Sequence, residues 1–259
     1  MARQLQTLCS IFILTLGAFV SACAQTAPDA SAQLRAAPLN TQQVVANMEQ
    51  RNLDRALALK QLEGSRLYRM EYRGFLKNED AEMTVSMNYC WPDKKNFTVL
   101  SQSGSKFVIE HVFKKLLEAE QEALQPANLA HNGLTSANYE FELVGYEETP
   151  HSAQYVLAVT PREKTKFLYV GKIWIDANDF AVTRVEAEPA KNPSFWIKKS
   201  EIRHTYAKVD GFWLPSENHT ESMIRVGGKA TLSIEYSNYK ITQADAPQAK
   251  AATAALKLQ

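Results

Sequence analysis

Two carboxylates three residues apart, Asp176 and Asp179 in "IWIDANDFAVTRVE", could form a metal site or a catalytic carboxylate pair. A Ca²⁺ loop needs oxygen ligands at alternate positions and a closing glutamate, but Ala177 and Phe180 interrupt that series. A glycosidase pair needs two carboxylates that face each other across a cleft, and neighbours on one turn seldom do. Asp and Asn favour turns because they bond to nearby backbone groups. The pair is therefore interpreted as a hairpin turn.

Histidines offer a second kind of chemistry. His204 and His219 fall on consecutive predicted strands and could face each other, with Glu201, Glu217 or Glu221 nearby as further metal ligands. No two histidines of the chain have the spacing of a known metal motif. Exposed polar positions on the outer face of the strands are the better interpretation, so neither a metal nor a cofactor is predicted.

Motifs of catalysis and of nucleic-acid binding are missing from the sequence. It lacks a nucleophile elbow, a zinc-protease motif, a dithiol motif and a phosphate loop. Cys90 could be a nucleophile, but a small core residue is the better interpretation. The formal net charge of +1 argues against nucleic acid as a partner. The sequence predicts that the protein is not an enzyme.

The N-terminal segment has the pattern of an export signal. Leu8 to Val20 is apolar and too short for a helix that crosses a bilayer. The following "VSAC" is similar to a lipobox, which would leave Cys23 lipidated, whereas Ala22 to Ala24 also fits ordinary cleavage before Gln25. Residues 1–23 are therefore predicted as a signal peptide. The mature protein is expected in the periplasm, either free or tethered to the outer membrane through Cys23.

The rest of the chain is predicted to form one domain, residues 40–243, between a flexible tether (24–39) and a flexible tail (244–259). Both flanking segments are rich in Ala, Gln, Ser and Pro without periodicity. A first helix follows a cap at Asn40 or Thr41. After Gly64 the pattern changes to about ten short strands in antiparallel succession, with a tight turn at Gly227-Gly228. This is a mainly β (α+β) fold with a long sheet that must curl.

Two stretches predict which strand residues face the interior of this sheet. The segment "EMTVSMNYCW" alternates strictly, which places its apolar residues on one face. In "FLYVGKIWID" both alternating sets are apolar, which is typical of a strand covered on both faces, with helices as the second cover. Between the strands, residues 105–124 show helical periodicity up to Pro126 and predict an amphipathic helix. The apolar residues of this helix are Ile109, Val112, Phe113, Leu116 and Leu117.

Three motifs carry a resemblance to a known family: "IWID" before a turn, "VDGFWLP" between strands and the late "YSNY". With the export signal and the two helices, the sequence resembles the bacterial outer-membrane lipoprotein carrier and receptor superfamily, the Lol-type lipoprotein-sorting fold. The resemblance implies an incomplete β-barrel around a hydrophobic cavity, with helices as a lid. It also implies an arginine that engages the lid, for which Arg69 and Arg73 on the first strand are the candidates.

The expected function is a monomeric cell-envelope protein that binds acyl chains of lipids or lipoproteins, in lipoprotein sorting or lipid transport. An envelope-stress-type sensor that binds a partner protein on the same fold is the alternative, and a hydrolase or metal enzyme comes last. The lid is expected at residues 105–124. The cavity lining is expected to consist of Met83, Val85, Met87, Tyr89 and Phe141 from the strands and Val112, Phe113, Leu116 and Leu117 from the helix.

Overall fold

The computed structural model describes residues 37–75, 77–92, 94–149, 152–192 and 194–244. The predicted signal peptide with Cys23, most of the tether and all of the tail after Ala244 lie outside the described residues. These three expectations therefore remain predictions.

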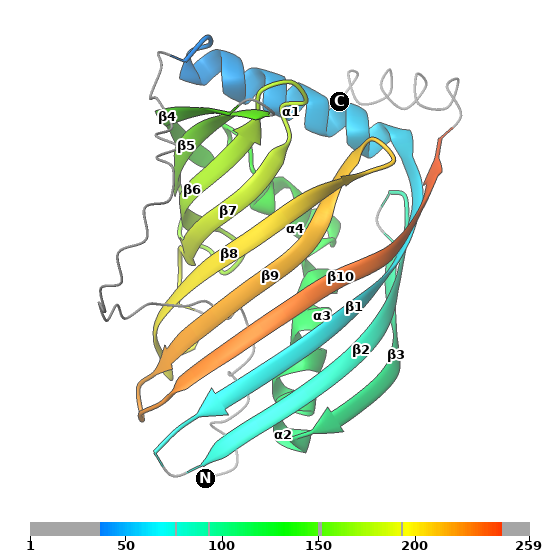
Figure 1. Cartoon of the computed structure of the whole chain (residues 1–259), viewed down its shortest axis with the longest axis vertical. Helices are drawn as coiled ribbons and strands as arrows, with labels where there is room; N and C mark the ends of the chain where they lie inside the picture. Colours follow the sequence, from blue (N-terminus) through cyan, green and yellow to red (C-terminus); the bar gives the residue numbers. More distant parts are fainter. Residues whose placement is uncertain (1–36, 76, 93, 150–151, 193, 245–259) are drawn as a thin grey trace, which may run out of the picture.

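Ten antiparallel strands form one sheet with the order β3-β2-β1-β10-β9-β8-β7-β6-β5-β4 (Figure 1). The sheet is not closed, because β3 and β4 are its two edges in the described part of the chain. The mainly β fold with about ten strands is thus confirmed. The strands are β1 (Leu59–Arg73), β2 (Asn78–Cys90), β3 (Lys94–Gly104), β4 (Tyr139–Thr149), β5 (Ser152–Pro161), β6 (Tyr169–Asp176), β7 (Val182–Pro189), β8 (Ile197–Val209), β9 (Phe212–Ile224) and β10 (Lys229–Gln243).

Helices lie on one face of this sheet, which we call the inner face (Figure 1). The first helix is α1 (Thr41–Ala58). Between β3 and β4 the chain forms α2 (Lys106–Val108), a π-helical turn η1 (Ile109–Phe113) and α3 (Lys114–Ala123), followed by α4 (Pro126–Asn132). The segments α2, η1 and α3 run on without a break, and we call them the mid-chain helix. The predicted helix at 105–124 is confirmed.

Local chemistry explains where these elements begin and turn. Asn40 caps α1 through a capping box, in which its side chain accepts from the Gln43 amide and Gln43 bonds back to the Asn40 amide. The β9–β10 turn has φ near 100° at Gly227 and 98° at Gly228. Residues other than glycine rarely adopt a positive φ of this size, so the predicted two-residue turn is confirmed.

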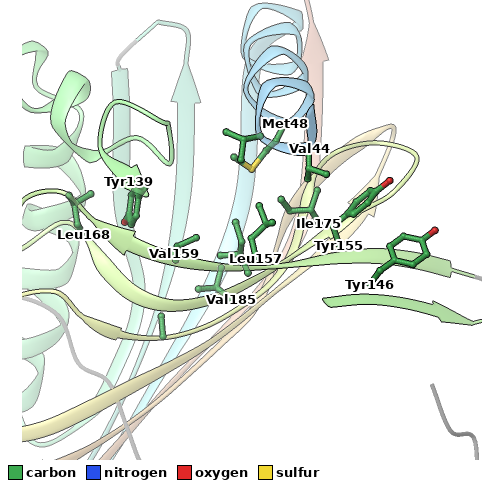
Figure 2. Packing of buried hydrophobic residues seen from close by; sticks show 13 residues of the cluster. Val44, Met48, Tyr139, Tyr146, Tyr155, Leu157, Val159, Leu168, Ile175 and Val185 are labelled. Atoms are coloured by element: carbon green, nitrogen blue, oxygen red, sulfur yellow. The ribbon is translucent and has the colours of Figure 1, made fainter. Parts of the chain in front are cut away.

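The two halves of the inner face are covered by different helices. Helix α1 packs on β4 to β7 through Val44, Val45 and Met48, against a cluster that includes Leu157 and Ile175 (Figure 2). The mid-chain helix covers β1, β2 and β10. The sheet therefore carries a separate apolar cluster under each helix, and a third, smaller cluster contains Leu62, Met87, Phe212 and Leu214.

One expectation about these elements was wrong. On β6, Ile173, Trp174 and Ile175 are all buried as expected, but side chains rather than a helix cover the outer face. The Arg184 guanidinium lies 3.6 Å from the centre of the Trp174 ring, and Glu147 accepts from the indole nitrogen. The mid-chain helix ends before Pro126 as predicted, and Pro126 then begins the additional short helix α4, a position where its missing N–H costs nothing.

Candidate functional site

An apolar interface between the mid-chain helix and the inner face of the sheet is the candidate site. The buried residues of this interface, which we call the helix-covered cluster, come from three strands and one helix. They are Tyr68, Met70, Ala81, Met83, Val85, Ala230, Leu232 and Ile234 from the sheet, and Val108, Ile109, Val112, Phe113 and Leu117 from the helix. Phe113 is completely buried, and its ring lies 5.7 Å from the ring of Tyr68.

The mid-chain helix begins abruptly at the edge of the sheet. Gly104 has φ near 87°, and Ser105 then caps the helix by accepting from the Val108 amide at 3.4 Å. The next turn, Ile109–Phe113, is π-helical, and such turns are rare and frequent at functional sites. The helix is therefore attached to β3 by one glycine and contains an irregular turn at its most buried part.

At its other end the helix is held by an ion-pair cluster. Glu120 accepts from the Arg66 guanidinium at 2.5 and 2.9 Å in a bidentate pair, and from the Lys95 ammonium at 2.5 Å. Arg66 is 6% exposed. Burial opposes the charge on Glu120, but the hydrogen bonds and charges of Arg66 and Lys95 prevail and keep the pKa of that carboxyl below its usual range. Glu120 is therefore ionised at neutral pH.

Arg66 joins the helix to the sheet, and the sequence reasoning missed it. Its guanidinium also lies about 5 Å from the rings of Phe97 and Tyr236. Arg69 and Arg73, the two expected candidates, instead lie on the opposite, exposed face. There Arg69 pairs with Glu82 and Glu235, and Arg73 with Glu71 and Asp80. Strand parity decides the assignment, because only even-numbered residues of β1 face the helix.

A polar strip runs along the inner face of β8 and β9, between the apolar clusters under the two helices. Ser200 and Ser222 are buried and share a hydrogen bond of 3.2 Å. Thr220 donates to Asn218 at 2.7 Å, and Asn218 lies 3.4 Å from His204 Nδ1. We call these five residues the polar strip.

His204 is the titratable member of the polar strip. Its ring stacks on Tyr206 with centres 4.7 Å apart, and Nε2 is buried without a hydrogen-bond partner among the described residues. Burial, with the nearby charge of Arg66, lowers the pKa of His204 to about 4. The imidazole is therefore neutral at neutral pH.

The two histidines considered as metal ligands, His204 and His219, do not face each other, and the preferred outer-face interpretation is wrong for His204, whose Nε2 is buried. His204 lies opposite Asn218 and His219 lies opposite Arg203 in the β8–β9 register, so the two histidines occupy opposite faces. Among the residues that the structure describes, no three His, Cys, Asp or Glu side chains are grouped to hold a metal ion. Cys90 is half-buried with a free thiol.

The expected cavity-lining residues fall into three places. Met83, Val85, Val112, Phe113 and Leu117 meet in the helix-covered cluster, and Leu116 packs against it. Met87 belongs to a neighbouring cluster with Leu62, Phe212 and Leu214, against which Tyr89 packs. Phe141 lies apart from all of these, against the cluster under α1.

The acidic pair with which the sequence reading began is a structural turn. Asp176 accepts from the amides of Asn178 and Asp179 at 3.0 and 2.7 Å, which is the turn predicted from the sequence. Asp179 in turn accepts from the Trp213 indole at 2.8 Å and pairs with Lys208. Its carbonyl oxygen accepts from Arg55 of α1 at 3.0 Å. The turn thus ties α1 to the β8–β9 hairpin.

We expect Asp179→Ala to lower the free energy of unfolding by about 1–2 kcal/mol, because the indole of Trp213 and the Lys208 ammonium lose their acceptor. The hydrogen bonds from these two groups lower the pKa of Asp179 below its ordinary 3.8. Their contribution is therefore present above pH 3.8 and is lost as the pH falls through the lower, folded-state value. Urea unfolding at pH 7 and pH 3 measures both effects. The control Glu163→Ala, on an exposed loop, should change stability by less than about 0.5 kcal/mol.

A hollow of about 810 Å³ lies on the outer face, away from both helices. Charged side chains of both signs surround it, among them Lys172, Glu186, Arg203 and Glu221. The described helices include none that is long and apolar enough to span a bilayer.

Comparisons with known proteins find one matching sequence family and several similar solved structures. Residues 112–239 match the sequence profile of a family of unknown function (DUF5686). No curated protein sequence matches the chain. Among solved structures, a DUF1329 family protein from Desulfovibrio piger is 14% identical, with 76% of this chain and 92% of that chain covered and a TM-score of 0.36.

Two further solved structures are similar in the same way. A LolA superfamily protein from Nitrosomonas europaea is 10% identical, with 80% of this chain and 96% of that chain covered and a TM-score of 0.34. An outer membrane lipoprotein-sorting protein domain from Vibrio parahaemolyticus is 11% identical, with 83% and 99% covered and a TM-score of 0.39. At these identities the likeness concerns the fold alone.

Proposed function

We propose that the protein binds acyl chains of lipids or lipoproteins between the mid-chain helix and the inner face of β1, β2 and β10. The observation that carries the proposal is the helix-covered cluster: one amphipathic helix covers an apolar sheet surface. The helix follows a glycine of positive φ at one end and is held at the other by ion pairs of Glu120 and Glu122. A helix held in this way can move as a lid.

The chemistry of the covered surface suits an acyl chain. Met70 and Met83 contribute flexible thioether side chains that adapt to irregular apolar ligands. Each methylene that an acyl chain buries there gains about 0.8 kcal/mol relative to water. The polar strip lies beside this surface on β8 and β9, where its hydroxyl, amide and imidazole groups can accommodate the polar end of a lipid. The proposed role is that of a binding protein of the cell envelope, not of an enzyme.

Lipid retention by the purified protein tests this function. We expect native mass spectrometry and lipid extraction to find bound acyl lipid, and a fluorescent long-chain fatty acid to bind with enhanced emission. Val112→Asp places a charge in the covered interface and should abolish both signals. Glu110→Ala, on the exposed side of the same helix, is the matched control and should retain them.

A folding measurement makes the outcome unambiguous. Far-UV circular dichroism and a cooperative urea transition should show that Val112→Asp keeps its folded sheet, because the cluster under α1 does not involve the mid-chain helix. A wild-type protein that binds neither lipid nor fatty acid would contradict the proposal. So would a folded Val112→Asp variant that binds as well as the wild type.

The outer-face hollow favours a second candidate function, the partner-binding sensor. A surface of alternating charges such as Lys172, Glu186 and Arg203 can specify a protein partner by charge complementarity. On that alternative, charge reversal at Arg203 would weaken partner binding and leave fatty-acid binding unchanged.

A further inference from the structure

Three hairpin tips lie side by side at the end of the sheet opposite α1, along the lower left edge in Figure 1. They are residues 74, 75 and 77 between β1 and β2, 194–196 between β7 and β8, and 225–228 between β9 and β10, and we call them the rim. Tyr72 donates to the Gly227 carbonyl at 2.9 Å, which joins the first tip to the third.

The second tip is joined to the third as well. The Arg225 amide donates to the Trp196 carbonyl at 2.7 Å. The guanidinium of the same Arg225 lies 5.2 Å from the centre of the Phe195 ring. The rim is therefore one continuous surface built from three segments that are far apart in the sequence.

Each tip of the rim exposes a large apolar side chain. Phe75 is 93% exposed, Phe195 75% and Val226 67%. These are the three most exposed large apolar side chains in the described part of the chain. Apolar residues gathered at neighbouring loop tips indicate a surface that meets another apolar phase.

Basic side chains surround these apolar tips. Lys77 and Arg225 lie on the rim itself, Lys191 and Lys198 flank its second tip, and Lys106 lies at the start of the mid-chain helix, next to β2. Of these, Lys106, Lys191, Lys198 and Arg225 form no ion pair with a described residue. The three tips contain no acidic residue.

The turns at the opposite end of the sheet differ from the rim. The tight turns at Asp179 and Asp210 carry no basic residue, and Asp179 is paired with Lys208 of β8. The chain as a whole has a formal net charge of only +1, so the positive charge at the rim is a local property and not one of overall composition.

We propose that the rim docks the protein on the surface of a membrane that contains anionic lipids. Phe75, Phe195 and Val226 would enter the boundary between headgroups and acyl chains, while the lysines and Arg225 contact lipid phosphates. Each basic residue close to an anionic surface contributes about a fivefold gain in affinity. An acidic protein surface would match the charge but not the three protruding apolar tips.

The mid-chain helix begins at the same end of the molecule. The Ser105 amide donates to the Asp80 carbonyl at 2.8 Å, near the start of β2 and so near the first tip of the rim. Phe107 of the helix is partly exposed there. If the helix covers an acyl-chain site, as proposed above, docking places the start of that lid at the membrane. Docking itself does not depend on that function.

Depth-dependent quenching in vesicles tests the rim. We would place a tryptophan at Phe75 (Phe75→Trp) in the full-length chain and mix it with vesicles of phosphatidylcholine and phosphatidylglycerol in which the lipids carry bromine near the headgroup. The control is Leu100→Trp, on edge strand β3, where the native side chain is 60% exposed and far from the rim. Both variants keep the same N-terminal segment, so an anchor there affects them equally.

The native tryptophans, including Trp196 on the rim, also emit, so the quenching of the native protein is subtracted from that of each variant. The remaining quenching on anionic vesicles should be stronger for Phe75→Trp than for Leu100→Trp. Replacing Lys77 and Arg225 with glutamine in Phe75→Trp should weaken its apparent affinity for the anionic vesicles by at least about tenfold. Equal quenching at both positions, or quenching that ignores these two replacements and the salt concentration, would overturn the proposal. Fatty-acid binding by the same variants, measured without vesicles, should be unchanged, which separates failure of the rim from failure of the proposed function.

Discussion

Replacing Glu120 with leucine should lower the free energy of unfolding by about 3 kcal/mol, one of the largest effects expected for a single side chain in this protein. The change leaves Arg66 buried at 6% exposure without its counter-ion and with Lys95, another cation, close by. An uncompensated buried charge costs far more than a well-formed buried pair gains. Urea unfolding followed by circular dichroism measures the loss.

A double variant identifies the origin of this loss. Arg66→Met combined with Glu120→Leu removes both charges, and we expect it to recover most of the stability. The Glu120 carboxyl has a pKa below its ordinary 4.5 because Arg66 and Lys95 bind it. The wild type should therefore lose this contribution as the pH falls below 4.5, and the double variant should not. Equal destabilisation in the single and double variants would show that packing of the guanidinium matters more than its charge.

Phe113→Ala is expected to weaken the attachment of the mid-chain helix by about 3–5 kcal/mol. The side chain is completely buried between the helix and the sheet, against Tyr68. If the helix is a lid, the loss appears as local opening: amides of residues 106–123 should exchange faster while those of β8 and β9 keep their protection. Hydrogen exchange read by mass spectrometry resolves the two regions.

Leu157→Ala provides the matched control in the other cluster. Leu157 is also completely buried, under α1, and its truncation should cost about 2–5 kcal/mol. Here the loss should appear as global unfolding, with no preferential exchange in residues 106–123. The lid interpretation fails if Phe113→Ala and Leu157→Ala produce the same pattern of exchange across the protein.

Patterns within one segment could be interpreted correctly from the sequence. The alternation from Met83 to Met87 predicted the covered face of β2, and helical periodicity predicted the mid-chain helix, because each signal depends only on neighbours along the chain. The turn at Asp176 and Asp179 was predictable for the same reason, since an Asx turn closes over a few residues. Phe141 was placed with the wrong cluster, because parity shows the face of a strand but not which helix covers that part of it.

Contacts between distant segments were beyond the reach of the same reasoning. Arg66 meets Glu120 across 54 residues. The expected candidates Arg69 and Arg73 lie on the other face of β1, because neighbouring parities of a strand point to opposite faces. The outer cover of Trp174 by Arg184 was missed because a cation can replace a helix as the cover of an aromatic ring.

The sequence by itself determined the elements of this protein: the strands, the two main helices, the turns and the apolar face of each, all of which follow from local periodicity and turn chemistry. Only the tertiary structure decided how they meet. Pairing of β1 with β10 joins the strands β1–β3 to the strands β4–β10 in one open sheet. This order places Arg66 against the helix, separates the clusters under the two helices by a polar strip, and gathers Phe75, Phe195 and Val226 on one rim. Strand register and order are set by the packing of the whole sheet, so no single segment carries that information.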